Sequence, residues 1–259
     1  MQPTIVQAAN PIGIVAALAA EASALGRGTR LTRGSTDSAE LASLPDGALL
    51  AVSGMGCEAA ARGALALADA GCGALVSWGL AGGLDPALVP GTIVVPETVL
   101  FEGGPALGVS PGWREQVLHE LASRIGIGIG SGAGSGTGGA LLTSAHALVG
   151  AAEKQAAFRR TGAVAVDMET YAIAEVAARR GLPCLAVRVI VDAESDEVPG
   201  VLAESANARG RIAVGRLLAG IVSAPAMLLP LMRLAGRYRA ARRSLQAIAR
   251  SGALTRALR

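Results

Sequence analysis

Apolar and polar positions alternate between Pro11 and Val191 in a way that predicts one α/β domain. Short apolar runs are separated by segments of helical length, which is typical of βα units around a largely parallel sheet. The expected strands are Ile12–Ala17, Leu49–Ser53, Ala74–Trp78, Thr92–Val95, Leu141–Thr143, Ala163–Val166 and Cys184–Val191. The expected helices are Cys57–Ala70, Trp113–Ser123, Leu148–Arg159 and Thr170–Arg180. We therefore expect a twisted, mixed or mostly parallel central sheet flanked by helices.

The glycine-rich segment Gly126–Gly139 is predicted to be a flexible connection between strands. A dinucleotide-binding fingerprint would lie between the first strand and its helix, with an acidic residue about twenty positions further on. Here the glycines lie in the middle of the chain and are followed by Leu141 and Leu142 rather than by a helix. We therefore expect no dinucleotide cofactor.

The pattern changes after Arg209. An apolar stretch broken by Pro225 and Pro230 is too interrupted to predict a transmembrane helix. Met232–Leu258 then places apolar residues among arginines, with no acidic residue, which predicts a basic amphipathic helix. Its apolar residues include Leu234, Tyr238, Leu245 and Ile248. Such a helix binds anionic membrane surfaces, or it packs on the body or on another subunit, and the pattern leaves both open.

These boundaries divide the chain into a catalytic domain, residues 1–222, and a basic C-terminal extension, residues 223–259. We expect the domain to fold without the extension. Half of the 259 residues are hydrophobic but only 2% are aromatic, so the core must consist of Ala, Val, Leu and Ile. The net charge of +3 is modest, and we expect no nucleic-acid partner.

The three cysteines, Cys57, Cys72 and Cys184, are scattered through apolar runs, which argues against a disulfide framework or a zinc site. The start of the chain lacks the basic region of a signal peptide. We expect a cytoplasmic protein without a metal, with peripheral contact at the inner membrane if the extension binds lipid.

Candidate ligand-binding residues follow several of the expected strands, because parallel sheets bind their ligands at the carboxyl ends of strands. Glu21 follows the first strand, Gly79–Gly83 follow the third, and Asp167–Glu169 and Asp192 follow the last two. We expect these residues to meet at one edge of the sheet.

Three segments carry a family resemblance, in the family's order and spacing. They are IGIVAALAAEA, VSWGLAGGLDPALVPGTIVVP and AVDMETYAIAEVAARRGLPCLAVRVIVD. They resemble the nucleoside phosphorylase and nucleosidase superfamily, which includes purine nucleoside phosphorylases and methylthioadenosine/S-adenosylhomocysteine nucleosidases. The resemblance implies that superfamily's single-domain fold, a purine nucleoside substrate, no cofactor and a homo-oligomer. The whole chain is most similar to the hopanoid-associated branch, thought to remove adenine from adenosylhopane.

The resemblance also implies roles for the candidate residues. Cleavage produces a ribosyl cation and a purine anion, so a carboxylic acid must protonate the base, and Asp192 matches that general acid. Glu169 matches the residue that grips the ribose hydroxyls, and Met168 would pack on the sugar. Gly82 belongs to the substrate-binding loop. His146 could face the base, although a lone histidine also fits a structural role.

The co-substrate is water or phosphate. Glu21 matches the glutamate that activates water in the nucleosidases, whereas Ser77 and Leu80 stand where phosphorylases place phosphate ligands, and the expected arginine is missing there. We therefore expect hydrolysis. The alternatives are phosphorolysis of the same substrate, a methylthioadenosine/S-adenosylhomocysteine nucleosidase, and a non-catalytic purine-binding or membrane-scaffold protein.

Overall fold

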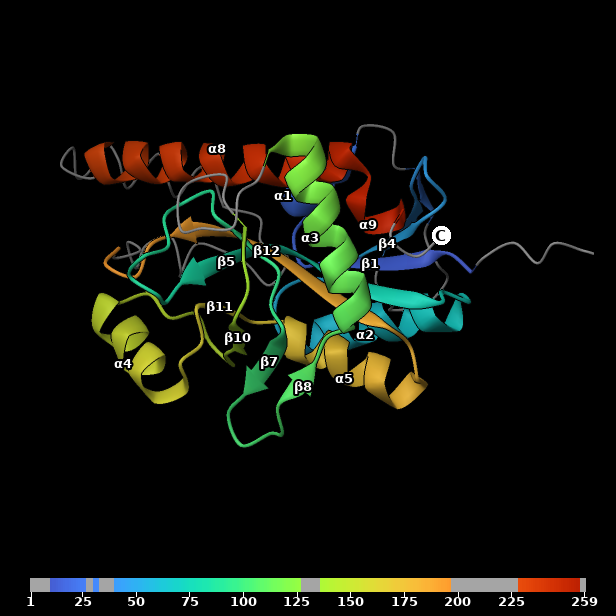
Figure 1. Ribbon diagram of the computed structural model, residues 1–259, viewed down its shortest axis with the longest axis horizontal. Helices are drawn as coiled ribbons and strands as arrows, with labels where there is room; N and C mark the ends of the chain where they lie inside the picture. Colours follow the sequence, from blue (N-terminus) through green and yellow to red (C-terminus); the bar gives the residue numbers. More distant parts are fainter. Residues whose placement is uncertain (1–9, 27–29, 33–39, 127–135, 197–227, 257–259) are drawn as a thin grey trace, which may run out of the picture.

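One mixed sheet runs through the molecule (Figure 1). The computed structural model describes residues 10–26, 30–32, 40–126, 136–196 and 228–256. In this part of the chain twelve strands form the sheet, in the order β2-β3-β4-β1-β5-β11-β10-β7-β8, while β12 pairs with β5 and β6, and β6 with β9. The strands are β1 Ile12–Ala16, β2 Arg30–Thr32, β3 Glu40–Ser43, β4 Leu49–Val52, β5 Ala74–Gly83, β6 Ile93–Val94, β7 Thr98–Phe101, β8 Leu107–Gly108, β9 Gly136–Thr137, β10 Ala140–Thr143, β11 Ala165–Asp167 and β12 Cys184–Asp192.

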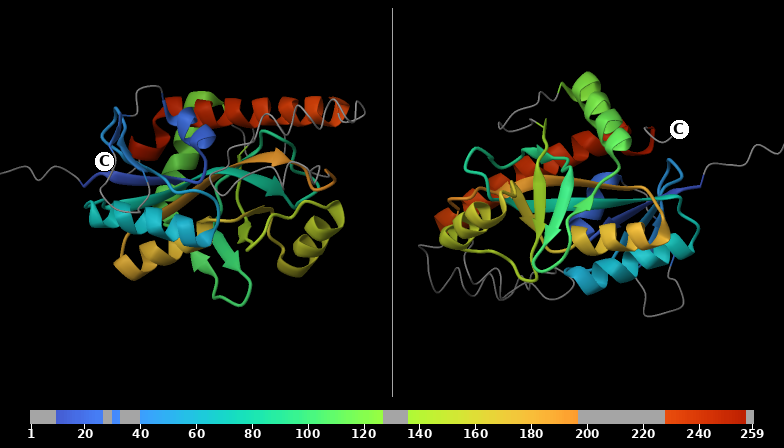
Figure 2. Two further views of the ribbon diagram at one scale, coloured as in Figure 1. Left: turned by 180° about the vertical axis from the view of Figure 1, so that it is seen from behind. Right: turned by 60° about the horizontal axis from the view of Figure 1, so that its bottom comes forward.

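Helices cover both faces of the sheet, as an α/β fold requires (Figures 1 and 2). On one face, α2 (Cys57–Asp69) packs against α5 (Thr170–Arg180). On the other lie α3 (Pro111–Ile125), α8 (Leu228–Ser251) and α9 (Ala253–Arg256). The remaining helices are α1 (Ala19–Ala22), the 3-10 turn η1 (Ser23–Leu25) and α4 (Ala151–Thr161). The predicted fold class and the four predicted helices are confirmed.

β5 is longer than predicted and organises the site. It pairs in parallel with β1 and β12, and antiparallel with β11. The expected strand ended at Trp78, with a loop through Gly82, but the structure continues the strand to Gly83. Pairing with β12 extends as far as Gly82 opposite Asp192 and satisfies the backbone of the glycine run. The expectation of a loop here was wrong, and Gly82 is a strand residue.

Several segments were not predicted as strands, among them β2, β3, β7 and β8. The end of the glycine-rich segment forms β9, which pairs with β6, while residues 127–135 lie outside the described residues. The boundary between residues 222 and 223 and Pro225 also lie outside them, whereas Pro230 is in the first turn of α8 (Leu228–Ser251).

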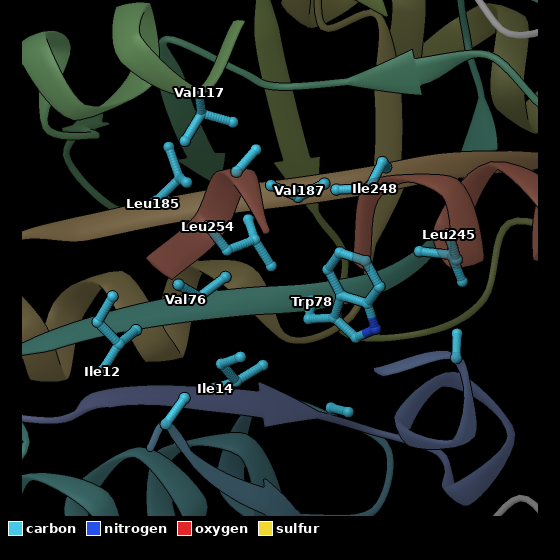
Figure 3. Packing of buried hydrophobic residues seen from close by; sticks show 14 of the residues in the cluster. Ile12, Ile14, Val76, Trp78, Val117, Leu185, Val187, Leu245, Ile248 and Leu254 are labelled. Atoms are coloured by element: carbon cyan, nitrogen blue, oxygen red, sulfur yellow. The ribbon is translucent and has the colours of Figure 1, made fainter. Parts of the chain in front are cut away.

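The C-terminal helices belong to the main hydrophobic core (Figure 3). Leu245 and Ile248 of α8 are buried in the same cluster as Trp78 of β5 and Val187 of β12. The side chains of Leu245 and Ile248 are therefore unavailable to a bilayer. The C-terminal half of α8 packs on the α/β domain. α8 also contacts η1, and the expectation that the domain folds without the extension stays a prediction. Within the described part of the chain, no helix is long and apolar enough to cross a membrane.

Candidate active site

Glu21 is a buried carboxylate at the carboxyl end of β1. The short helix α1 carries it, and the side chain is only 5% exposed. Its Oε1 accepts a hydrogen bond from the backbone N–H of Leu80 (2.8 Å), and its Oε2 accepts one from Leu18 (3.0 Å). The indole N–H of Trp78 donates to the backbone oxygen of Glu21 (3.1 Å), so the core fixes this residue. Burial raises the pKa of Glu21, and the nearby Arg188 opposes the rise.

Arg188 lies inside the apolar strand β12 and is fully buried. Its Nε and Nη2 donate to Asp167 Oδ2 at 2.8 and 2.7 Å. Nη2 also donates to the hydroxyls of Ser77 (2.7 Å) and Thr170 (2.9 Å). These contacts of Nε and Nη2 fix the orientation of the planar guanidinium.

The third nitrogen of Arg188, Nη1, is buried without a hydrogen-bond partner among the described residues. Arg188 pairs with Gly79 across the β5–β12 ladder, and Nη1 lies on the side of Gly79. A methyl group at Gly79 would lie 3.1 Å from Arg188 Nη1 and 2.5 Å from Glu21 Oε1. The Glu21 carboxylate and the Arg188 guanidinium therefore both pack against Gly79, and only glycine leaves room for them there.

Glu169 precedes α5 and binds the loop after β4. Its Oε1 accepts from the N–H of Gly56 (2.8 Å), and its Oε2 accepts from Met168 (3.3 Å). Burial and the neighbouring Asp167 raise the pKa of Glu169 to about 7, although Arg188 and the Gly56 bond favour its ionised form.

We call Glu21, Asp167, Glu169 and Arg188 the negative cluster. It contains three buried carboxyl groups and one guanidinium. With every group ionised its net charge would be −2, and this excess of negative charge adds to burial in raising the pKa of Glu169. A ligand that carries or develops positive charge would be stabilised here.

Asp192, at the end of β12, is 7% exposed and lies in a second group of charges. The fully buried Lys154 of α4 donates to Asp192 Oδ2, to the backbone oxygen of Ala193 (2.9 Å) and to that of Asp196 (3.0 Å). Arg237 of α8 pairs with Asp196 Oδ1 at 2.5 Å. We call Asp192, Asp196, Lys154 and Arg237 the balanced cluster. Burial raises the pKa of Asp192, and Lys154 is the strongest opposing influence.

Gly82 joins the two clusters. It pairs with Val166 of β11 on one side and with Asp192 of β12 on the other. A methyl group at Gly82 would lie 3.4 Å from Asp192 Oδ2 and 3.3 Å from Val166 Cγ1. The glycine therefore leaves room for the Asp192 carboxylate beside the strand that leads to Asp167 and Glu169.

The structure thus gathers most of the predicted residues at one end of β5: Glu21, Met168, Glu169, Gly82 and Asp192. His146 is different, because it lies on an exposed turn after β10. At the expected phosphate position, Ser77 is buried and bonded to Thr170 and Arg188. The third-strand loop itself carries no arginine, as expected, but Arg188 of β12 reaches Ser77.

Sequence reasoning missed Arg188 and Lys154, and it placed Asp167 at the site without giving it a role. Arg188 had a signal, since a charged residue inside an apolar strand must be paired. Among the described residues, no group of three or more His, Cys, Asp and Glu side chains is arranged to hold a metal ion. A cavity of about 250 Å³ lies elsewhere, against α8 and α9, and is lined by Ile14, Leu44 and Leu254 among others.

Comparisons with known proteins agree with this architecture. Residues 11–222 match the family described as the phosphorylase superfamily. The 5′-methylthioadenosine/S-adenosylhomocysteine nucleosidase of Helicobacter pylori, solved with butyl-thio-DADMe-Immucillin-A, has a TM-score of 0.65 at 16% identity, covering 83% of this chain and 99% of that one. The S-adenosylhomocysteine nucleosidase of Streptococcus pyogenes, solved with 5-methylthiotubericidin, has a TM-score of 0.63 at 21% identity, covering 73% and 87%.

The futalosine hydrolase of Helicobacter pylori has a TM-score of 0.65 at 16% identity, covering 83% of this chain and 98% of that one. At these identities the likeness establishes a shared fold. No curated protein matches the sequence significantly.

Proposed function

This chain belongs to the phosphorylase superfamily, and on that premise we propose that it cleaves the N-glycosidic bond of a purine nucleoside by hydrolysis and releases adenine. The observation that carries the proposal is the negative cluster beside the end of β5. Bond cleavage leaves positive charge on the ribose, and a preorganised site with excess carboxylate stabilises that charge as it develops.

Within the negative cluster, Glu169 would accept hydrogen bonds from the ribose 2′- and 3′-hydroxyls, with Met168 packed against the sugar. These charge-assisted bonds strengthen as the sugar becomes cationic. Because Glu169 has a pKa of about 7, it is partly ionised near neutral pH, and a cationic sugar would draw it into the ionised form.

We assign the nucleophile to water beside Gly79. Glu21 would take a proton from that water, as its match to the water-activating glutamate of the nucleosidases implies, and its carboxylate lies directly against Gly79. Burial raises the pKa of Glu21, which makes its carboxylate a stronger base than an exposed one. A phosphate dianion would instead enter a cluster in which carboxylates outnumber cations three to one.

Asp192 would protonate the departing base at N7, as its match to the family's general acid implies. Gly82 would then keep the approach to the carboxylate open. We leave His146 out of the proposed site because it is exposed.

We further propose adenosylhopane as the substrate, with peripheral attachment to an anionic membrane. The support is the outward face of α8. Met232, Arg239, Arg243 and Arg250 follow one another at intervals of seven, four and seven residues, so they share one face of the helix, opposite Leu245 and Ile248. All four are exposed, and Met232 is 66% exposed. A membrane-embedded lipid nucleoside requires such a surface, whereas a small soluble nucleoside does not.

Phosphorolysis of the same substrate is the nearest alternative, and it is favoured by one observation: Arg188 Nη1 is an unpartnered cationic donor. A methylthioadenosine/S-adenosylhomocysteine nucleosidase is the other alternative, since proteins with those names share the fold. We expect a homo-oligomer in either case, from the family resemblance.

The test is adenine release from a panel of adenosine, methylthioadenosine, S-adenosylhomocysteine and adenosylhopane in vesicles, with and without phosphate. We expect release without phosphate, together with a reducing sugar, and the highest kcat/KM on adenosylhopane. A sugar 1-phosphate product that disappears when phosphate is removed would establish phosphorolysis. Release from none of the four would remove the proposed function.

A further inference from the structure

Lys154 is the only lysine of the chain, since the other 22 basic residues are arginines. It is 0% exposed, although the charged neighbours Glu153 and Arg159 on α4 are exposed. Lysine is rarely buried fully unless it is paired. A single buried lysine in a chain rich in arginine points to a role for an ammonium group that a guanidinium would not fill.

The contacts of Lys154 converge on the end of β12. Its ammonium has three hydrogens and three acceptors: Asp192 Oδ2, the Ala193 oxygen at 2.9 Å and the Asp196 oxygen at 3.0 Å. All of its donor capacity is therefore used to hold Asp192 and the turn that follows it. Asp192 Oδ2 is the bound oxygen, which leaves Oδ1 for another partner.

We propose that Lys154 is a positioning residue for the general acid: it holds Asp192 by Oδ2, presents Oδ1 to the purine, and stabilises the carboxylate formed when the proton leaves. This inference rests on the proposed function. In the step, the Oδ1 proton moves to purine N7 while the electron pair of the C1′–N9 bond goes to the purine. Asp192 is left as a carboxylate beside the ammonium and regains its proton from water.

The charge around Asp192 comes from three elements. Lys154 of α4 and Arg237 of α8 favour the ionised carboxylate, while Asp196 of the turn disfavours it. Lys154 is the nearest of these groups, since it bonds the carboxylate directly. Removing its charge should make Asp192 hold its proton more strongly and deliver it less readily.

The kinetic test is the pH profile of Lys154→Met, which keeps an unbranched buried chain without charge. We expect kcat to fall by about tenfold or more, with a smaller change in KM. Activity needs protonated Asp192 and is lost as pH rises, so the alkaline limb should move to higher pH in the variant. A limb that stays in place, whatever the loss of kcat, would mean that Lys154 is only structural and would overturn the proposal.

A second measurement does not depend on activity or on the folding of that variant. Because the chain has one lysine, isotopic labelling of lysine gives a single side-chain NMR signal from the full-length protein. We expect an ammonium with slowly exchanging hydrogens, whose signal moves in Asp192→Asn and on addition of adenine. The matched control Glu194→Gln changes another buried acid of the same turn and should leave the signal in place.

The outcomes separate the two claims. If no nucleoside is cleaved but the Lys154 NMR signal responds to Asp192→Asn, the proposed function fails while the contact between Lys154 and Asp192 is supported. A lysine signal that exchanges freely, or that ignores Asp192→Asn, overturns the positioning role even if adenine is released.

Discussion

Two groups of buried charges flank the end of β5, and they differ in balance. The negative cluster combines the carboxyl groups of Glu21, Asp167 and Glu169 with one guanidinium. The balanced cluster sets two carboxylates, Asp192 and Asp196, against Lys154 and Arg237. The negative cluster has more carboxyl groups than cations, whereas the balanced cluster has two of each. An imbalance retained in a buried site is costly unless a ligand or a proton corrects it, whereas balance serves to hold a group in place.

This difference assigns the two halves of the reaction to two regions. The negative cluster suits the ribose, which becomes cationic, and the water that attacks it. The balanced cluster suits the acid, because Lys154 both holds the Asp192 carboxyl group in place and favours release of its proton. The predictions below test this division.

The largest expected effect is that of Asp192→Asn. The amide keeps the shape of the side chain but has no acidic proton to deliver, so turnover should fall by about 10²- to 10⁴-fold with nucleoside binding largely intact. Single-turnover adenine release and calorimetric binding of a nucleoside measure the two quantities. Glu194→Gln is the control, and near-normal turnover in folded Asp192→Asn would remove this residue from the mechanism.

Arg188→Met should destabilise the fold strongly, since it leaves three buried carboxyl groups without their cation. Breaking a buried ion pair by removing one partner costs about 3–5 kcal/mol. The loss should be greater at pH 8 than at pH 5, because burial raises the pKa values of Glu21 and Glu169 and these two groups take up protons more readily at the lower pH. Urea unfolding at both pH values measures it. Arg179→Met, at an exposed pair with Glu175, should cost under about 1 kcal/mol, and a similar cost at both positions would refute the imbalance.

Glu169→Gln should change how stability depends on pH. Folding raises the pKa of Glu169 from its ordinary 4.5 to about 7, so the folded state binds this proton more tightly than the unfolded state does. The resulting stabilisation is present below pH 4.5 and is lost as pH rises through about 7, by on the order of 3 kcal/mol. The amide should flatten that decline in unfolding free energy. If the unfolding free energy of Glu169→Gln depends on pH as that of the wild-type protein does, the group with the raised pKa is not Glu169.

The smallest effect concerns the outward face of α8. Arg239→Gln, Arg243→Gln and Arg250→Gln together should weaken co-sedimentation with anionic vesicles, by roughly 1 kcal/mol or less for each charge. Turnover of a soluble adenosine analogue should be unaffected. A triple variant at Arg62, Arg159 and Arg179 removes the same charge from exposed positions outside α8. Equal losses from both triple variants would indicate a general charge effect, and no loss from either would remove the membrane proposal.

The sequence predicted four helices and the main strands in their order along the chain, because the periodicity of apolar residues is a local signal. It stopped β5 too early, since glycines weaken an isolated strand and only the pairing with β12 shows that they are strand residues. It did not reveal that α8 packs into the core, because an apolar stripe beside arginines fits a bilayer and a protein surface equally well.

The site was predicted through its carboxylates but not through its cations. Glu21, Glu169 and Asp192 follow strands in chain order, whereas their cations come from elsewhere. Arg188 reaches the site from within β12, and Lys154 reaches Asp192 from α4, 38 residues earlier in the chain. Contacts at such separation follow from strand order and helix placement, which the local pattern does not specify.

The most direct test of the charge division compares two purine ligands of one shape. One carries a cationic pyrrolidine in place of the ribose ring, and the other a neutral tetrahydrofuran. Calorimetric affinities for the wild-type protein should favour the cationic ligand by about a hundredfold or more, as expected for a mimic of the transition state, and Glu169→Gln should reduce that preference. Equal affinities, or tighter binding of the neutral ligand, would contradict the assignment of the negative cluster to a cationic sugar.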